Sequence, residues 1–207
     1  MARKKIKILI SAGPTREYID PIRFISNPSS GKMGYLIAEY AKKNGFDVIL
    51  VSGPTHLEPP EGVKLIKVET AKQMEKEILK NFPKVDILIM AAAVSDWRPY
   101  RKFKRKLKRK NQWALKLIPN PDILKNVSNI KKENQKIIGF ALETDNILKN
   151  AIKKLKEKKI DLIIGNTPDF FGEGKKSDVF FIFKDGKVLK FKIKKEQLPP
   201  KIFELIL

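Results

Sequence analysis

The chain has 207 residues, a length that fits one domain with a sizeable hydrophobic core. It contains no cysteine, which excludes disulfides, thiolate metal sites and cysteine nucleophiles. The formal net charge of +21 raises the possibility of a nucleic-acid partner or of a small polyanion such as a triphosphate, while about half of the charge is expected to be solvated surface with no partner. The only histidine, His56, lies in a Pro-rich segment that we expect to be an exposed loop, which argues against a zinc site or a histidine-based triad.

Buried strands and amphipathic helices are predicted in alternation along the chain. Short apolar runs predict strands, and apolar residues spaced by three and four predict helices. The predicted strands are residues 5–11, 47–54, 63–70, 85–93, 136–144 and 161–166. The predicted helices are residues 32–45, 71–82, 121–130 and 146–160, with a last helix from about residue 200. A short alternating segment covers 113–118, and Asp185-Gly186 predicts the turn of a β-hairpin over 179–193.

This order predicts a doubly wound, Rossmann-like α/β fold. We expect a mostly parallel sheet with helices on both faces and a C-terminal antiparallel β-hairpin. No repeat or linker divides the chain, so residues 1–207 are predicted to form one domain. The N-terminal apolar run is too short for a signal peptide or a membrane span, and we expect a cytoplasmic protein.

Ligands of such sheets bind beyond the C-terminal ends of the strands. Four polar loops, "SAGPTRE", "AAAVSDWRP", "GFALETD" and "GNTPD", each follow a predicted strand. They should therefore converge on one edge of the sheet.

A Ser-Ser-Gly-Lys segment opens the first predicted helix. The free N–H groups and the dipole of a helix N-terminus favour an anion there. The segment is not a P-loop, because Ser26 stands at the first glycine of G-x-x-x-x-G-K-[ST] and Met33 at the Mg²⁺-binding Ser or Thr. Gly31 and Gly34 would allow close approach of a ligand, and Gly13 is expected to face the same point. The alternative is a serine cap beside a packing glycine.

Three further features could belong to a site or to ordinary structure. Asn27 could donate to a carboxylate or phosphate oxygen, or could form an Asx turn before Pro28. Asp96 could accept hydrogen bonds from a ligand, or could cap a helix. Lys154 and Lys158 share one helix face, where they could bind an anion or be plain surface lysines.

The segment Arg101–Lys110, "RKFKRKLKRK", holds eight basic residues and no acidic one. We name it the basic loop. It could be a mobile lid that closes over phosphates, or a solvated run of charge. It could also contact RNA, although only Phe103 interrupts it for base stacking.

Taken together, the motifs resemble the phosphopantothenoylcysteine synthetase family. They are "AGPTREYIDPIRFISNPSSGKMG", "AAAVSDWRP", "NPDIL", "GFALET", the helix with Lys154 and Lys158, and "GNT", in that order. The resemblance runs from about Lys5 to the C-terminus and implies an enzyme that joins 4′-phosphopantothenate to L-cysteine in coenzyme A biosynthesis. In many bacteria this domain is fused behind a flavin-dependent decarboxylase. The chain has neither room nor a catalytic cysteine for that half, so we expect a free-standing synthetase.

The resemblance also implies the chemistry. The bacterial type uses CTP and the eukaryotic type ATP, and this sequence looks like the bacterial type. The carboxylate of 4′-phosphopantothenate attacks the α-phosphorus of CTP and expels pyrophosphate. The cysteine amine then attacks the acyl-cytidylate and releases CMP. Mg²⁺ would be held mainly by the triphosphate and water, because no carboxylate cluster is evident.

Matched position by position, the family implies roles for individual residues. Asn27 would hold the activated carboxylate, and Lys106 would neutralise the phosphates during transfer. Lys104, Lys108 and Arg109 are rival candidates for the second role. The residues implied in nucleotide binding are Gly13, Ser29, Gly31, Gly34, Asp96, Lys106, Asn120, Pro121, Asp122, Ile123, Phe140, Lys154, Lys158 and Asn166. The residues implied in substrate binding are Arg23, Asn27, Ala92, Ala93 and Asp96.

Arg23 matches a position that, in the family, reaches substrate from a neighbouring subunit, which implies a homodimer. Three other functions remain as alternatives. One is the same ligase using ATP, and another is a non-catalytic nucleic-acid-binding domain, suggested by the net charge. The third is a dinucleotide oxidoreductase, which we rank last because G-x-G-x-x-G does not follow the first predicted strand.

Overall fold

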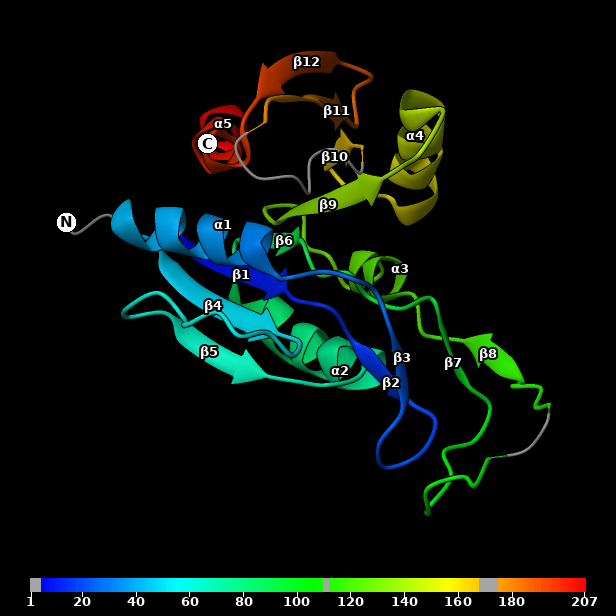
Figure 1. Ribbon diagram of the computed structural model, residues 1–207. Coiled ribbons are helices and arrows are strands. Elements are labelled where there is room, and N and C mark those ends of the chain that lie inside the picture. The colour runs from blue at the N-terminus through cyan, green and yellow to red at the C-terminus, as the bar shows by residue number, and fades with distance from the viewer. Residues whose placement is uncertain (1–4, 110–111, 168–174) are drawn as a thin grey trace.

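The computed structural model describes residues 5–109, 112–167 and 175–207. Its centre is an eight-stranded sheet with the strand order β12-β11-β10-β9-β6-β1-β4-β5 (Figure 1). The strands are β1 (Lys7–Ala12), β4 (Asp47–Ser52), β5 (Lys64–Lys67), β6 (Ile87–Met90), β9 (Lys136–Leu142), β10 (Leu162–Asn166), β11 (Ser177–Phe183) and β12 (Val188–Ile193). The helices are α1 (Lys32–Lys43), α2 (Ala71–Asn81), α3 (Ile123–Ser128), α4 (Ile147–Lys158) and α5 (Leu198–Ile206).

Neighbouring strands from β10 to β5 pair in parallel, and β11 is the one strand of this sheet that runs the other way. β11 pairs antiparallel with β10, and β12 pairs antiparallel with β11. The Gly186 backbone has φ +91°, as the predicted hairpin turn requires. The doubly wound α/β fold with its C-terminal hairpin is therefore confirmed. Among the helices of the described residues, none is long and apolar enough to cross a membrane.

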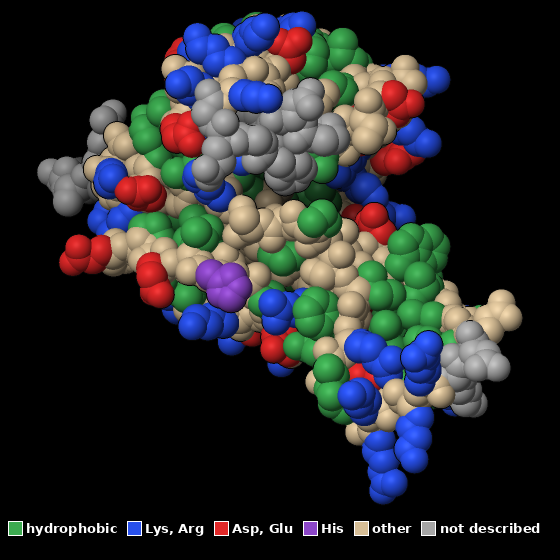
Figure 2. All heavy atoms as spheres, viewed as in Figure 1, with side chains coloured by type: hydrophobic (Ala, Val, Ile, Leu, Met, Phe, Trp, Pro, Cys, Tyr) green, Lys and Arg blue, Asp and Glu red, His purple; other side chains and the backbone are tan. Residues whose placement is uncertain are grey.

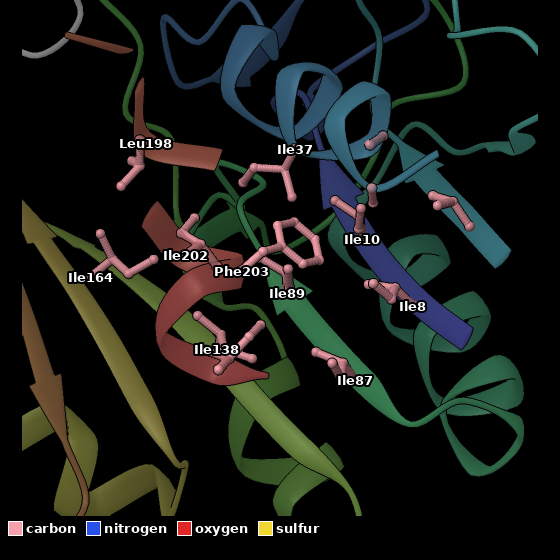
Figure 3. Packing of buried hydrophobic residues seen from close by; sticks show 14 of the residues in the cluster. Ile8, Ile10, Ile37, Ile87, Ile89, Ile138, Ile164, Leu198, Ile202 and Phe203 are labelled. Atoms are coloured by element: carbon pink, nitrogen blue, oxygen red, sulfur yellow. The ribbon is translucent and has the colours of Figure 1, made fainter. Parts of the chain in front are cut away.

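Alternating side chains of the strands supply two separate cores, one on each face of the sheet. Ile8 and Ile10 of β1 pack with Ile37 of α1 and with Ile202 and Phe203 of α5 (Figure 3). The residue between them, Leu9, belongs to the opposite core, which is built with α2, α3 and α4. Since strand side chains point to opposite faces in turn, the apolar run of β1 serves both layers. Helices on both faces are thus confirmed.

Two short hairpins project from one end of the sheet, and we call them together the extension. β2 (Arg16–Tyr18) pairs with β3 (Phe24–Ser26), and β7 (Trp97–Pro99) pairs with β8 (Leu117–Pro119). The basic loop lies at their far end (Figure 1). Apart from the alternating segment that overlaps β8, these strands were not predicted, because three residues carry too little periodicity to be recognised.

Candidate active site

A cavity of about 490 Å³ lies beyond the C-terminal ends of β6 and β9, beside α3 and α4. Its size falls within the usual range for small-molecule sites. Its wall contains eight of the residues predicted to bind nucleotide. These are Asp96, Asn120, Pro121, Asp122, Ile123, Phe140, Lys154 and Lys158. We name it the first cavity. The structure therefore brings together residues from two loops, one strand and two helices that are well separated in sequence.

Hydrogen bonds orient the Asn120 side chain on this wall. Its Nδ2 donates to the Ser95 carbonyl at 2.8 Å, and its backbone N–H donates to the Asp96 carbonyl at 2.7 Å. The Arg98 guanidinium donates to Asn120 Oδ1 at 3.2 Å and also to the Pro119 carbonyl. Because both ends of the amide are bonded, Asn120 is held in one orientation.

Asp122 links the start of α3 to α4. Its Oδ1 accepts from the Lys125 backbone N–H at 3.1 Å, which caps the helix. Its Oδ2 forms an ion pair with Lys158. The pair holds the Lys158 ammonium beside the cavity, where an anionic ligand could compete for it.

Lys154 is partly buried on the same wall. Its Nζ donates to the Phe140 carbonyl at 2.8 Å. Burial lowers the pKa of Lys154, because the ammonium loses hydration, and the nearby charges of Glu143 and Asp96 only partly offset this effect. A bound phosphate would supply the missing compensation. The first cavity is therefore suited to an anionic ligand.

A second cavity of about 660 Å³ is lined by Asn27, which bonds to the Ala93 segment. Its wall includes Arg16, Asn27, Ser29 and His56. Asn27 Nδ2 donates to the carbonyls of Ala93 at 3.3 Å and of Val94 at 3.2 Å. Val94 and Ala92 line the first cavity. Asn27 thus lines the second cavity and bonds to a segment whose residues Ala92 and Val94 line the first, directly against the residues predicted to bind substrate.

The loops around the start of α1 pack closely. Gly31 has φ +81°, and a Cβ placed there would lie 3.1 Å from the Gly13 Cα, so both positions require glycine or a rearranged loop. Ser29 Oγ accepts from the Gly31 N–H at 3.3 Å. A Cβ on Gly34 would lie 2.5 Å from the Ala12 Cβ, so Gly34 allows α1 to approach β1. Gly13, Gly31 and Gly34 line neither cavity.

The basic loop is attached to the β2–β3 hairpin through one buried carboxylate. Asp20 Oδ2 forms an ion pair with Arg23 at 2.5 Å and accepts from the Leu107 N–H at 3.2 Å. The Arg23 guanidinium also donates to the Leu107 carbonyl at 2.8 Å. Burial disfavours the charged form of Asp20, but the hydrogen bonds from Arg23, Ile22 and Leu107 outweigh it and hold the Asp20 pKa well below its usual value.

Several predicted residues lie away from both cavities. Arg23 contacts Asp20 and Leu107 of its own chain. Lys106 is exposed beside the anchored Leu107, and Lys110 lies outside the described residues. Asn166 is buried at the end of β10, and its carbonyl accepts from the Glu143 N–H at 3.0 Å. The roles of these residues toward ligands stay predictions.

Two arginines were not singled out from the sequence, one that lines the second cavity and one that bonds to a residue of the first. Arg98 orients Asn120, and Arg16 lines the second cavity. Both lie in the predicted loops "SAGPTRE" and "AAAVSDWRP". A charged residue at the end of a loop of small residues could have marked each arginine as a candidate for ligand binding. The sequence pattern did not show which way either side chain points.

No group of three or more His, Asp or Glu side chains comes together as a metal site within residues 5–109, 112–167 and 175–207. The two carboxylates of the first cavity do not form one either. Asp122 is engaged with Lys158 and the α3 N-terminus, and Asp96 stands alone. The described side chains therefore form no carboxylate cluster of the kind that holds a metal ion by protein ligands alone.

Comparison with known proteins identifies the family. Residues 3–207 match the family described as the DNA/pantothenate metabolism flavoprotein C-terminal domain. The chain belongs to this family. It is 45% identical over 184 residues to the coenzyme A biosynthesis bifunctional protein CoaBC of Borreliella burgdorferi, covering 87% of this chain and 47% of that protein. It is 44% identical to the CoaBC protein of Bacillus subtilis over 86% of this chain and 45% of that protein.

The family resemblance predicted from the motifs is thus confirmed. The chain spans about half the length of the curated CoaBC relatives it matches. Among solved structures, the C-terminal domain of a CoaBC protein superposes with a TM-score of 0.83 at 40% identity, over 97% of this chain and 93% of that one. The Streptococcus pneumoniae DNA/pantothenate metabolism flavoprotein has the same fold, with a TM-score of 0.86 at 24% identity over 97% and 98% of the two chains.

Proposed function

We propose that the chain is the ligase that joins 4′-phosphopantothenate and L-cysteine into 4′-phosphopantothenoyl-L-cysteine for coenzyme A biosynthesis. The observation that carries the proposal is the position of Asn27. Asn27 lines the second cavity, and its amide bonds to the Ala93 segment, whose neighbours Ala92 and Val94 line the cavity that holds Lys154 and Lys158. The names of its CoaBC relatives support the same pathway.

The first step activates the substrate carboxylate. One carboxylate oxygen of 4′-phosphopantothenate bonds to the α-phosphorus of CTP, and the bond from that phosphorus to the bridging oxygen breaks to release pyrophosphate. The nucleotide occupies the first cavity, where Lys154 and Lys158 attract its phosphates. Asn27 holds the reacting carboxylate, because an amide can donate to it without adding a net charge. The reaction resembles other phosphoryl transfers in that positioning and charge stabilisation dominate.

The second step forms the amide. The cysteine amine bonds to the acyl carbon of the acyl-cytidylate, the bond to the phosphate oxygen breaks, and CMP leaves while the amine loses a proton to solvent. CTP is proposed as the co-substrate on the bacterial resemblance of the motifs, with ATP as the alternative. Mg²⁺ is proposed to travel with the triphosphate, and we assign it no ligand from the protein.

The basic loop is proposed to close over the phosphates, with Lys106 as the residue that reaches them. The loop projects from the far end of the extension, so closing requires the extension to carry it toward the first cavity or toward a neighbouring chain (Figure 1). A homodimer would fit the second route. Ile22, Trp97 and Tyr100 of the extension are at least half exposed, at 60%, 52% and 62%. Figure 2 shows hydrophobic side chains gathered beside the Lys and Arg cluster.

Burying that apolar surface against a second copy would stabilise a dimer. Light scattering in solution checks this point. A mass equal to one chain at working concentration would contradict the dimer.

The products of the reaction test the proposed function. With Mg²⁺, L-cysteine and 4′-phosphopantothenate, we expect CTP to yield CMP and pyrophosphate in step with amide formation. Each of CTP, ATP, GTP and UTP is supplied singly, and the products are separated by chromatography. Release of CDP and inorganic phosphate in step with product would rule out the acyl-cytidylate route.

Lys154→Met tests the first cavity as the nucleotide site. Methionine keeps the length of the side chain but removes the charge, so we expect CTP binding to weaken by about tenfold or more, the scale for losing a hydrogen bond to a charged group. The free energy of unfolding should not fall, because the buried ammonium costs hydration in the unliganded protein. Calorimetric titration with CTP measures the affinity, and urea unfolding measures the free energy of unfolding.

The matched control is Lys153→Met, which removes an exposed lysine from the neighbouring position, where it pairs with Glu157 at 3.9 Å. We expect its CTP affinity to stay within about twofold of the original, since screened surface charges contribute little. Equal losses in the two variants would mean that the cavity attracts nucleotide only through general charge.

A further inference from the structure

Arg16 presents an uncompensated positive charge to the second cavity. Its backbone is fixed, because Arg16 N–H donates to the Glu69 carbonyl at 2.7 Å and the residue pairs with Ser26 across the β2–β3 hairpin. Its guanidinium lies over the ring of Phe24, 4.7 Å from the centroid. Within the described part of the chain, this guanidinium has neither an ion pair nor a side-chain hydrogen bond. The hairpin therefore holds it in place while its donors stay free.

No carboxylate of the described residues forms an ion pair with this guanidinium. Among the described residues that line the second cavity there is no Asp or Glu, and Arg16 is the single Lys or Arg. The two nearest acidic residues in sequence are engaged elsewhere. Glu17 is buried and accepts from the Ala71 N–H at 2.8 Å, and Asp20 holds Arg23. A guanidinium with free donors at a cavity wall is suited to an anion, and its planar fork matches a carboxylate.

The position of Asn27 relates this charge to the reaction. Asn27 and Arg16 line the same cavity, and Asn27 follows directly after Ser26, the cross-strand partner of Arg16. If the nucleotide occupies the first cavity, CMP leaves on that side of Asn27. The incoming amine then approaches the acyl carbon from the second cavity. L-Cysteine carries a carboxylate on the carbon next to this amine.

We propose that Arg16 binds the carboxylate of the incoming amino acid, and so selects an α-amino acid over a simple amine. The proposal rests on the ligase function proposed above. The terminal phosphate of 4′-phosphopantothenate is an anion too, and its binding by Arg16 would be a different assignment. The test therefore measures the kinetic constants for cysteine and for 4′-phosphopantothenate separately.

The test compares two nucleophiles on the full chain. Cysteamine has the amine and thiol of cysteine but no carboxylate. In Arg16→Gln we expect kcat/KM for cysteine to fall by about tenfold or more, the scale for losing a hydrogen bond to a charged group, while kcat/KM for cysteamine stays within about threefold. The KM for 4′-phosphopantothenate should not change, and neither should the burst of pyrophosphate released before cysteine is added. Arg16→Lys should recover part of the preference for cysteine.

Lys190→Gln is the matched control, because the Lys190 ammonium also lies over a phenylalanine ring, at 5.3 Å from Phe180, and Lys190 lines neither cavity and lies outside the basic loop. It should keep the full preference for cysteine over cysteamine. Equal losses for both nucleophiles in Arg16→Gln, or a raised KM for 4′-phosphopantothenate, would overturn the assignment. A parent protein that forms no amide from cysteine would instead overturn the proposed function, whatever Arg16 does.

Discussion

Asn27→Asp is expected to lower the rate of amide formation by about a hundredfold or more, the scale for losing one preorganised donor to a transition state. The aspartate would place a negative charge against the reacting carboxylate and phosphate. It would also replace the donor that now bonds to the carbonyls of Ala93 and Val94. CTP binding should be preserved, because the first cavity is lined by other residues. Steady-state assays and calorimetric titration with CTP measure the two effects.

The control for this change is Asn44→Asp. The Asn44 amide also donates to a backbone carbonyl, that of Tyr40 at 2.8 Å, but lies at the other end of α1 and lines neither cavity. It should leave the turnover within about twofold of the original, as expected for a surface change. Urea unfolding of both variants separates a lost fold from a lost donor. Near-normal turnover in a folded Asn27→Asp protein would show that Asn27 is only a structural residue.

Lys106→Ala is expected to slow formation of the acyl-cytidylate by about two orders of magnitude. An ammonium placed against the transferring phosphorus contributes on the order of 3 kcal/mol in the transition state. Lys106 is next to Leu107, whose N–H and carbonyl are anchored to Asp20 and Arg23. These bonds fix the position of the backbone from which the Lys106 side chain extends. The rate of the first step is measured by quenched flow with each basic residue of the loop replaced in turn.

The loop supplies its own control in Lys102→Ala. Lys102 lies over the ring of Tyr18, 4.7 Å from the centroid, and is therefore occupied within the extension. Its loss should change the rate by less than about threefold, because screened surface charges contribute well under 1 kcal/mol. Lys110→Ala should be equally mild. If Lys104, Lys108 or Arg109 dominates the scan, the catalytic role belongs to that residue.

The same scan separates the ligase from the nucleic-acid alternative. A nucleic-acid surface neutralises phosphates with many basic residues, so each would contribute similarly to binding and to its salt dependence. Measuring each variant at two salt concentrations shows which pattern holds. A profile in which every substitution is mild and alike would remove Lys106 from the catalytic site.

The sequence by itself determined the fold class, and through the family resemblance it named eight of the residues that line the first cavity. The six other residues implied in nucleotide binding, among them Gly13, Gly31 and Lys106, do not line it. The apolar runs of β1 and β6 and the spacing of α1 and α2 are local patterns, because a buried strand or an amphipathic helix must repeat its apolar side chains at a fixed period. The resemblance carried residues such as Asp96, Phe140 and Lys154 to one site. The structure places them together because parallel strands end at the same edge of a sheet.

Only the tertiary structure decided which distant groups the extension brings into contact. Asn27 bonds to a carbonyl 66 residues away, and Leu107 bonds to Asp20 across 87 residues. The strands that bring these groups together have three residues each, too few for a periodic signal. The sequence could not predict that the Arg16 guanidinium lacks an ion pair either. Whether it finds a partner depends on which acidic residues already bond to other groups. Partners of this kind follow from packing between distant segments, and no local pattern of residues specifies them.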